Sequence, residues 1–501
     1  MRTSVVPDLL RVRLSEMIAE RMGLHFPPER WGDLERGLVG AAKEFGLADV
    51  AACVDWLLSA ALTKAQLEVL ASHLTVGETY FFREKKTFDA LAESILPELI
   101  RARRASERRL RIWSAACCTG EEPYSLAILL AQVIPDLADW NVTILATDIN
   151  DRFLKKAAAG VYGEWSFRES PAWFKERYFQ RTADGRYSIL PEIKKRVTFA
   201  HLNLAGDVFP SLETDTNAMD LIFCRNVLMY FTLPQLQKVV GNLHRALVPD
   251  GWLVVSPSEC SQVHFSHFAP VNFPSVILYQ KSVLKERMPP PWTPPPPSSE
   301  TVEFVATAGE PPAAWMRPPT ETPPLEETTP TEIPLQPQAA AVSFYEQGRY
   351  AEAAEVLLAS LDSSNAPDPE MASLLARALA NQGKLADALA WCERWLAADK
   401  LDASGHYLRA MILQELRDPE QARRSLQRAI YLDQEFIVGH FALGNLARDS
   451  DKPEEADKHF ANALQLLHRC EPGEILPESE GLTAGRLTEI IHSIATLEAA
   501  P

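Results

Sequence analysis

Hydrophobic residues in the first 75 positions recur every three or four residues, which is the spacing of amphipathic helices. One stripe runs through Leu34, Leu38, Ala41, Ala42 and Phe45, and a second runs through Val50, Val54, Leu57 and Leu58. This spacing places the apolar side chains of each segment on one face of a helix, where they can be buried. We therefore predict an N-terminal helical domain over residues 1–75.

Between residues 76 and 286 the pattern changes to short apolar runs that alternate with helical stretches. The predicted strands are residues 110–115, 142–148, 197–202, 219–224 and 252–256, and the clearest helices begin near Pro123 and cover residues 233–247. Such alternation is typical of an α/β fold with a mostly parallel sheet. Residues 163–195 fit less well, because they contain many aromatic residues and an Asp-Gly turn. We interpret them as an inserted β-rich subdomain.

Residues 287–340 contain 16 of the 37 prolines of the chain. A segment of this composition cannot bury enough apolar surface to fold, so it is predicted to be a semi-extended linker. A proline-rich recognition motif is the alternative. The length of the linker predicts that the part of the chain beyond it is tethered and not tightly docked.

Residues 341–470 repeat at a regular interval. Alanines near the start of successive helices lie at 353, 388, 422 and 456, so that the intervals are 35, 34 and 34 residues. This is the period of tetratricopeptide repeats, and four of them can stack into a stable α-solenoid. Residues 471–501 form a C-terminal tail, in which residues 482–497 are predicted to be a capping helix.

The composition narrows the classes of function. The net charge of −17 argues against nucleic acid as the main partner. No apolar run is long enough to insert into a membrane, and seven scattered cysteines without a CxxC motif indicate reduced thiols in the cytoplasm. His201, His264 and His267 have no ligands at metal spacing, so no metal is expected. Six arginines between Arg101 and Arg111 are interpreted as a solvated helix face, with contact to an acidic receptor surface as the alternative.

Candidate chemistry follows the first two predicted strands. The first strand runs into Ala116-Cys-Cys-Thr-Gly120 and then Glu121 and Glu122. A glycine turn at the carboxyl end of a strand lets a ligand approach the backbone, but two carboxylates disfavour a pyrophosphate. They suit a cofactor with a cationic end, such as S-adenosylmethionine. Asp148, at the end of the second strand, suits the hydroxyls of a ribose. The alternative for all three carboxylates is stabilisation of a helix N-terminus.

Three motifs resemble the chemotaxis receptor methyltransferase (CheR-type) family: TVGETYFFRE at residues 75–84, TGEEPYS at 119–125 and FCRNVLMYF at 223–231. The resemblance covers residues 1–286. It implies a protein-glutamate O-methyltransferase with a helical N-terminal domain and a Rossmann-like domain that carries a β-insert. The methyl donor is then S-adenosylmethionine, which leaves as S-adenosylhomocysteine, and the substrate is the cytoplasmic domain of a chemoreceptor. With its tetratricopeptide part, which we expect to bind an unknown protein or peptide, the chain resembles enzymes of Wsp-type biofilm or Frz-type motility pathways.

The resemblance also implies roles for individual side chains. The expected cofactor contacts are Thr79, Arg83, Glu122, Asp148, Asn203, Leu204, Arg225 and Asn226. Among these, Glu122 is expected near the amino group of the methionine moiety, Arg225 and Asn226 line the methionine end, and Asn203 and Leu204 lie beside the adenine. Arg83 and Tyr230 are expected to act on the substrate. The alternatives are a salt bridge from Arg83 to Glu84 or Glu122, and core packing for Tyr230.

The chain departs from the family at three places. Cys117 and Cys118 occupy positions that are usually small, and we expect them to pack, with a redox role as the alternative. Gly77 stands where many members have an asparagine, so one polar contact is expected to be lost or rerouted. The first 75 residues hold 8 Lys or Arg against 10 Asp or Glu, so the basic docking surface of the enteric enzyme is not expected. Two other functions stay open, namely an inactive cofactor-sensing scaffold and a methyltransferase for a different substrate.

Overall fold

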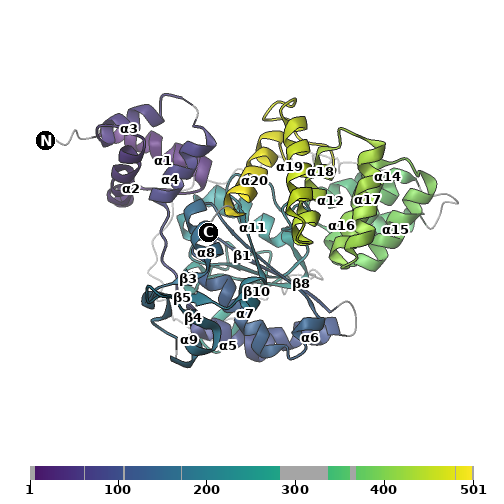
Figure 1. Ribbon diagram of the computed structural model, residues 1–501, viewed down its shortest axis with the longest axis horizontal. Helices are drawn as coiled ribbons and strands as arrows, with labels where there is room; N and C mark the ends of the chain where they lie inside the picture. The colour runs from purple at the N-terminus through teal and green to yellow at the C-terminus, as the bar shows by residue number, and fades with distance from the viewer. Residues whose placement is uncertain are drawn as a thin grey trace, which may run out of the picture.

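The computed structural model describes residues 6–60, 62–104, 108–170, 172–281, 337–361, 368–479 and 481–498. Helices at the N-terminus are followed by an α/β domain and then by a long array of helices (Figure 1). This order confirms the predicted combination of an α/β domain with helical regions on both sides. The predicted linker lies outside the described residues up to 336. No helix in the described ranges is both long and apolar enough to cross a membrane.

The N-terminal region contains four helices joined by short turns. They are α1 (Asp8–Met22), α2 (Trp31–Glu44), α3 (Val50–Leu57) and α4 (Lys64–Leu74). Polar side chains fix where two of them begin: Asp49 accepts a hydrogen bond from the backbone N of Ala52 at the start of α3, and Thr63 forms a capping box with Gln66 at the start of α4. The predicted apolar stripe on α2 is buried, with Leu34 and Leu38 each 1% exposed.

The α/β domain is built on a seven-stranded sheet in the order β6-β2-β1-β7-β8-β10-β9. The strands are β1 (Arg109–Ala115), β2 (Asn141–Asp148), β6 (Val197–His201), β7 (Met219–Cys224), β8 (Leu247–Val254), β9 (Ala269–Phe273) and β10 (Val276–Gln280). The first five in the order are parallel, and β10 is antiparallel to both of its neighbours. All five predicted strands are present. The hairpin β9–β10 was not predicted, because β9 is exposed at alternate positions and contains Pro270.

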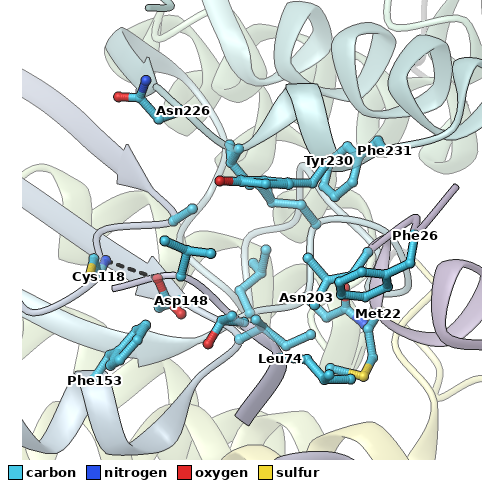
Figure 2. A pocket seen from close by; sticks show the side chains of 18 of the residues that line it. Met22, Phe26, Leu74, Cys118, Asp148, Phe153, Asn203, Asn226, Tyr230 and Phe231 are labelled. Carbon is cyan, nitrogen blue, oxygen red and sulfur yellow. Dashed lines mark hydrogen bonds between the residues drawn. The ribbon is translucent and has the colours of Figure 1, made fainter. Parts of the chain in front are cut away.

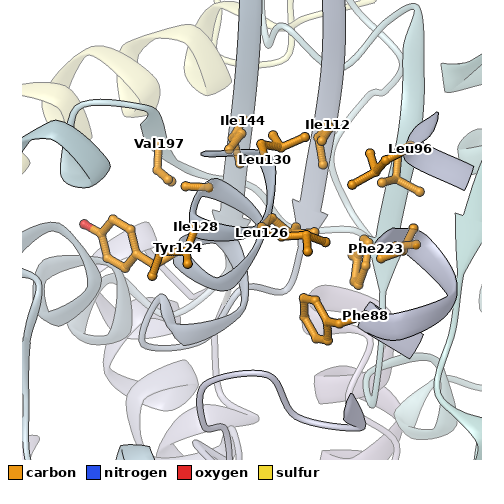
Figure 3. Close-up of a cluster of buried hydrophobic side chains, with 14 of the residues drawn as sticks. Phe88, Leu96, Ile112, Tyr124, Leu126, Ile128, Leu130, Ile144, Val197 and Phe223 are labelled. Carbon is orange, nitrogen blue, oxygen red and sulfur yellow. The ribbon is translucent and has the colours of Figure 1, made fainter. Parts of the chain in front are cut away.

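Helices cover both faces of this sheet. The main ones are α5 (Lys85–Ala90), a π-helical turn (Leu91–Ile95), α6 (Leu96–Arg104), α7 (Glu121–Val133), α8 (Asp151–Ala159) and α11 (Leu233–Ala246). Successive residues of a strand face opposite sides, so Ile112 packs with Leu126 of α7 in one core while Trp113 packs with Val240 of α11 in the other. Figure 3 shows the first core, in which α7 lies across the central strands. The two cores fix the carboxyl ends of β1, β2 and β7 at one edge.

The inserted subdomain contains the short strands β3 (Val161–Tyr162), β4 (Phe179–Arg181) and β5 (Tyr187–Ile189) in an antiparallel sheet of order β3-β5-β4. It also contains the helices α9 (Ala172–Tyr178) and α10 (Pro191–Lys194), so it is less purely β than the sequence suggested. Phe81 packs against its aromatic residues, including Phe167 at 5.0 Å between ring centroids. This contact ties the insert to the motif at residues 75–84.

The C-terminal array consists of helix pairs. The helices are α12 (Pro337–Glu346), α13 (Tyr350–Leu361), α14 (Pro369–Asn381), α15 (Leu385–Ala398), α16 (Ala403–Glu415), α17 (Pro419–Leu432), α18 (Ile437–Asp449), α19 (Pro453–Leu467) and α20 (Ala484–Glu498). Small residues allow the paired helices to approach closely. A Cβ on Gly444 of α18 would lie 2.4 Å from Cε1 of Phe460 on α19, so any side chain there would displace the Phe460 ring.

The repeats pack directly on the α/β domain, so the prediction of a loose tether is wrong. Arg109 on β1 donates to Glu415 Oε2 at 2.8 Å, Arg111 bonds both Glu415 and Asp215, and the Tyr407 hydroxyl donates to Glu213 at 3.1 Å. The side chains of Arg109 and Arg111 are only 3% and 1% exposed. These two arginines lie on a strand and pair with acidic residues of the chain itself, so for them the predicted solvated helix face is wrong. Arg101 and Arg104 of the same run do lie exposed on α6, as that prediction requires.

Candidate functional site

A cavity lies where the carboxyl ends of β1, β2 and β6 face the N-terminal helices (Figure 2). Its empty volume is about 740 Å³, including the part that is open to solvent. The order of the strands reverses between β1 and β7, and open α/β sheets bind ligands at such a point. The N-terminal helical region supplies one wall through Met22, Phe26 and Leu74. The helices at the N-terminus therefore complete the site.

The loop after β1 has an unusual backbone. Ala116, Cys118 and Gly120 all have left-handed φ values, of 61°, 52° and 93°. Gly120 is also enclosed, since a Cβ there would lie 2.8 Å from the Cβ of Ala157 and 2.9 Å from the Tyr162 hydroxyl. Non-glycine residues adopt this conformation only when their surroundings impose it, and such residues gather at binding sites. The loop is thus shaped to turn its backbone toward the cavity.

Asp148 ends β2 and lines the cavity. Its Oδ2 accepts a hydrogen bond from the backbone N of Cys118 at 2.9 Å, and its Oδ1 accepts one from the backbone N of Asn150 at 2.8 Å. Burial raises the pKa of its carboxyl to about 6. Asn150, not Asp148, caps the following helix by accepting from the backbone N of Arg152 at 3.0 Å. The capping alternative for Asp148 is therefore wrong, and its remaining lone pairs can accept bonds from a ligand.

Glu122, at the start of α7, belongs to a buried ion cluster next to this cavity. Arg225, at the end of β7, reaches Glu122 Oε2 at 3.1 Å and Glu84 Oε2 at 2.8 Å, and its own side chain is 2% exposed. Ser114 donates to the other Glu122 oxygen at 2.7 Å. Burial raises the pKa of Glu122, and Arg225 and Ser114 act against this shift. Because Arg225 takes both carboxylates, the suggested salt bridge from Arg83 to Glu84 or Glu122 is wrong.

Asn226 follows Arg225 and lines the cavity in a left-handed conformation, with φ of 57°. Glu259 holds it there, because the carboxylate accepts from the backbone N of Asn226 and of Val227, each at 2.8 Å. The Ser256 hydroxyl donates to the same carboxylate at 2.6 Å. Glu259 was not among the site residues expected from the sequence. Ser256-Pro-Ser-Glu259 is a capping-box pattern, and that signal could have drawn attention to it.

Asn203, Leu204 and Tyr230 also line the cavity. Figure 2 shows the ring of Tyr230 across one side, with its hydroxyl directed toward the side on which Asn226 and Asp148 lie. The Arg30 guanidinium lies 4.9 Å from the centre of this ring, and the Tyr230 carbonyl accepts from the backbone N of His25 at 2.8 Å. The N-terminal helical region thereby positions Tyr230.

Thr79 and Arg83 are not among the residues that line this cavity. Arg83 Nη1 donates to the carbonyl of Glu78 at 2.5 Å, and the carbonyl of Arg83 accepts from Arg225 at 2.8 Å. Gly77, in the same segment, lies next to a residue that lines the cavity. A Cβ on Gly77 would lie 2.7 Å from Cζ of Phe153, which is a lining residue. Phe153 thus occupies the space that a side chain at position 77, such as the asparagine expected from the family resemblance, would need.

These features suit the three parts of S-adenosylmethionine. The carboxylate of Glu122 suits a cationic amino group, and Asp148 offers oxygen acceptors to two ribose hydroxyls. Apolar side chains on the cavity wall, such as Leu202, Leu204 and Phe231, suit a flat adenine ring. The methionine end of the cofactor carries both an ammonium and a carboxylate. The ion pair of Glu122 and Arg225 offers one group of each charge, so it suits this end.

Comparisons with known proteins agree with this chemistry. The family described as "CheR methyltransferase, SAM binding domain" matches residues 77–277, and two tetratricopeptide repeat families match residues 339–403 and 403–436. A solved structure of MamA from Desulfovibrio magneticus is 22% identical and covers 27% of this chain and 78% of its own, with a TM-score of 0.26. That score is too low to carry an argument.

Curated relatives extend the match. "Chemotaxis protein methyltransferase" of Borreliella burgdorferi is 32% identical over 249 residues, which is 49% of this chain and 86% of that one. "Chemotaxis protein methyltransferase 2" of Vibrio cholerae is 36% identical over 39% of this chain and 66% of its own length. "Probable biofilm formation methyltransferase WspC" of Pseudomonas aeruginosa is 29% identical over 373 residues, or 74% of this chain and 78% of that one. The chain belongs to the CheR family of S-adenosylmethionine-dependent methyltransferases and carries tetratricopeptide repeats at its C-terminal end.

Proposed function

We propose that this protein transfers a methyl group to glutamate side chains in the cytoplasmic domain of a chemoreceptor, which gives glutamate methyl esters. The observation that carries the proposal is the single cavity that joins Asp148, Asn203, Leu204, Asn226 and Tyr230 at the switch point of the sheet. The names of the relatives, with chemotaxis and biofilm formation, support a signalling receptor as the substrate. The site of action would be the cytoplasm.

The cofactor would lie along this edge of the sheet. Asp148 would accept hydrogen bonds from the ribose, and Asn203 and Leu204 would flank the adenine. Glu122 and the Arg225–Asn226 pair would hold the methionine end, with Thr79 and Arg83 closing the site from residues 75–84. Bound S-adenosylmethionine supplies an activated methyl group on a sulfonium.

The chemistry demands little of the protein. A glutamate carboxylate has a pKa near 4.3, so it is already ionised at neutral pH and needs no general base. Its alignment and desolvation can account for the catalysis. The Tyr230 hydroxyl would donate to one carboxylate oxygen, and Arg83 would pair with the charge. Arg83 is available for this role because Glu84 and Glu122 are already paired with Arg225.

The repeats would recruit or respond to a protein or peptide partner. They lie against the α/β domain through Arg109, Arg111 and Glu415, so an occupant of the repeats could influence the enzyme through this interface.

The test is incubation of the purified chain with radiolabelled cofactor and candidate receptor cytoplasmic domains. Base-labile label on receptor glutamates is the expected result. Cofactor binding without transfer to any receptor domain would instead indicate an inactive cofactor-sensing scaffold, and transfer only to other acceptors would indicate a different substrate. Tyr230→Phe should lower kcat with little change in cofactor affinity, and Arg83→Ala should lower kcat by a larger factor than it weakens cofactor binding. Full transfer by both variants would remove them from the mechanism.

A further inference from the structure

The last helix, α20, connects the repeats to the cofactor cavity. Its apolar face, with Ala484, Leu487 and Ile491, is buried against the last repeat. Its other side meets β6 and the N-terminal helices, where Lys64 of α4 donates to the carbonyl of Glu489 at 3.0 Å. Figure 1 shows α20 between the N-terminal helices and α19. Three parts of the chain therefore meet at this helix.

Arg486 of α20 reaches the α/β domain with its guanidinium. Its Nη2 lies 2.7 Å from Asp207 Oδ2, 3.0 Å from His201 Nδ1 and 3.1 Å from the His201 carbonyl, while its Nη1 donates to Glu489 at 2.8 Å. The side chains of Arg486 and Asp207 are 13% and 12% exposed. Ion pairs this far from solvent hold their geometry more tightly than surface pairs.

The protonation states of His201 and Asp207 allow both side chains to accept hydrogen bonds from Arg486. Burial, and to a lesser degree the charge of Arg486, lowers the pKa of His201 to about 3. The ring is then neutral at physiological pH, and its Nδ1 can accept the bond that a guanidinium must donate. Burial raises the pKa of Asp207, and Arg486 acts against this by favouring the carboxylate.

Asp207 in turn shapes the segment that lines the cavity. The same Oδ2 that meets Arg486 accepts a hydrogen bond from the backbone N of Asn203 at 2.6 Å. The Asn203 side chain bridges onward, with its Oδ1 accepting from the backbone N of Ala205 at 3.0 Å and its Nδ2 donating to the carbonyl of Arg21 at 2.7 Å. Asn203 and Leu204 both line the cavity. One oxygen of Asp207 thus links Arg486 of α20 to the backbone of Asn203, in the turn of residues 203–207 that lines the cavity.

We propose that Arg486 is a positioning residue, which holds the Asn203–Asp207 turn in place and so sets the affinity of the adenine side of the pocket for S-adenosylmethionine. The inference rests on the proposed function, because that function places the adenine beside Asn203 and Leu204. It also means that the C-terminal helix of the repeat region contributes to a binding site on a different domain.

The test compares full-length variants by calorimetric titration with S-adenosylmethionine. Arg486→Ala should weaken binding about tenfold, which corresponds to about 1.4 kcal/mol. Arg486→Lys should lie between it and the unchanged protein, since an ammonium keeps the charge but cannot reach all three acceptors. At saturating cofactor the kcat should be unchanged. Arg377→Ala is the matched control, because Arg377 is also 13% exposed and pairs with Glu478 away from the cavity.

Two further measurements separate positioning from a general loss of stability. Asp207→Asn should give a similar loss of affinity, and its effect should not add to that of Arg486→Ala, since both act through one carboxylate. Amide hydrogen exchange in residues 203–207 should be faster in Arg486→Ala even without cofactor. This second readout does not depend on activity.

The outcomes distinguish the inference from its premise. If Asn203→Ala leaves the affinity unchanged, the proposed placement of the adenine fails. If Asn203→Ala weakens binding but folded Arg486→Ala and Asp207→Asn bind as tightly as the unchanged protein, the inference alone is overturned.

Discussion

Glu415, the last residue of α16, accepts a hydrogen bond from Arg109 Nη1 on β1 at 2.8 Å. The same carboxylate bonds Arg111, and its backbone carbonyl accepts from the Asn141 side chain at 2.8 Å. One residue of the repeat region therefore compensates two buried cations that lie two residues apart on β1, an interior strand of the sheet. Removing one member of a buried pair leaves a charge that has lost both water and its partner, which is strongly unfavourable.

Glu415→Ala should lower the free energy of unfolding by about 3–5 kcal/mol, measured by urea denaturation. Small-angle scattering should also show a larger particle, because the repeats lose their main polar anchor. Glu435→Ala is the control, since Glu435 pairs with Arg469 at the surface with 75% of its side chain exposed. It should change stability by less than about 0.5 kcal/mol. An unchanged scattering profile and stability for Glu415→Ala would show that apolar contacts alone hold the repeats in place.

Cofactor affinity should depend on pH through Asp148. Burial raises the pKa of its carboxyl to about 6, above the usual value of about 3.9. Only the ionised form can accept bonds from both ribose hydroxyls with all its lone pairs, so the affinity should rise as pH rises through about 6 and then level off. Fluorescence or calorimetric titrations between pH 5 and pH 8 would measure this.

The raised pKa of Asp148 affects the stability of the cofactor-free protein in the opposite direction, since this contribution to stability falls as pH rises. A folded-state pKa above that of the unfolded chain means that the folded form binds the proton more tightly. The contribution of Asp148 is therefore full below about pH 4 and is lost as pH rises through about 6. Asp148→Asn should bind cofactor more weakly and remove both dependences. If the affinity of the variant keeps the same pH profile, another group is responsible, and Glu122, whose pKa burial also raises, is the next candidate.

The sequence predicted the strands of the sheet best where burial was most complete. β1 is buried at all seven positions and β7 at all six, so their apolar runs were unambiguous. β9 is half exposed and gave no such signal. The repeats were found from the spacing of their alanines, yet nothing in that spacing revealed that Glu415 neutralises Arg109 and Arg111. Ion pairs between residues some 300 positions apart depend on tertiary packing, which local patterns do not encode.

In the site, too, the residues of the sequence motifs were predicted, whereas a contact that depends on tertiary packing was not. Five of the nine expected residues share the cavity, and Glu122 and Arg225 meet in an ion pair beside it. Glu259 was missed because its role depends on a carboxylate that reaches across to another loop. Motif resemblance finds residues that touch the ligand more readily than residues that hold the backbone beneath it.

Glu259→Gln tests that supporting role. An amide can accept at one oxygen only, so several of the donors from Ser256, Asn226 and Val227 would lose their acceptor. A loss of about 1–3 kcal/mol in stability is expected, and cofactor affinity should fall because Asn226 is free to leave its left-handed conformation. Urea denaturation and titration would measure the two effects. Glu164→Gln is the control, since Glu164 pairs with Lys175 at the surface with 68% exposure. If Glu259→Gln loses no more than this control, the loop does not depend on the carboxylate.

Gly77→Asn tests whether Phe153 excludes a side chain at position 77. The new Cβ would lie 2.7 Å from Cζ of Phe153, so the ring must move, and the cavity that it already lines has room to receive it. Cofactor affinity should therefore fall about tenfold or more, while stability changes little because the segment is exposed. Phe153→Ala alone should cost less, and the double variant Gly77→Asn with Phe153→Ala should recover affinity, since removal of the ring leaves room for the asparagine side chain. Titration of all three variants decides the matter. A double variant that binds no better than Gly77→Asn would mean that the glycine is needed for its backbone and not for the space it leaves to Phe153.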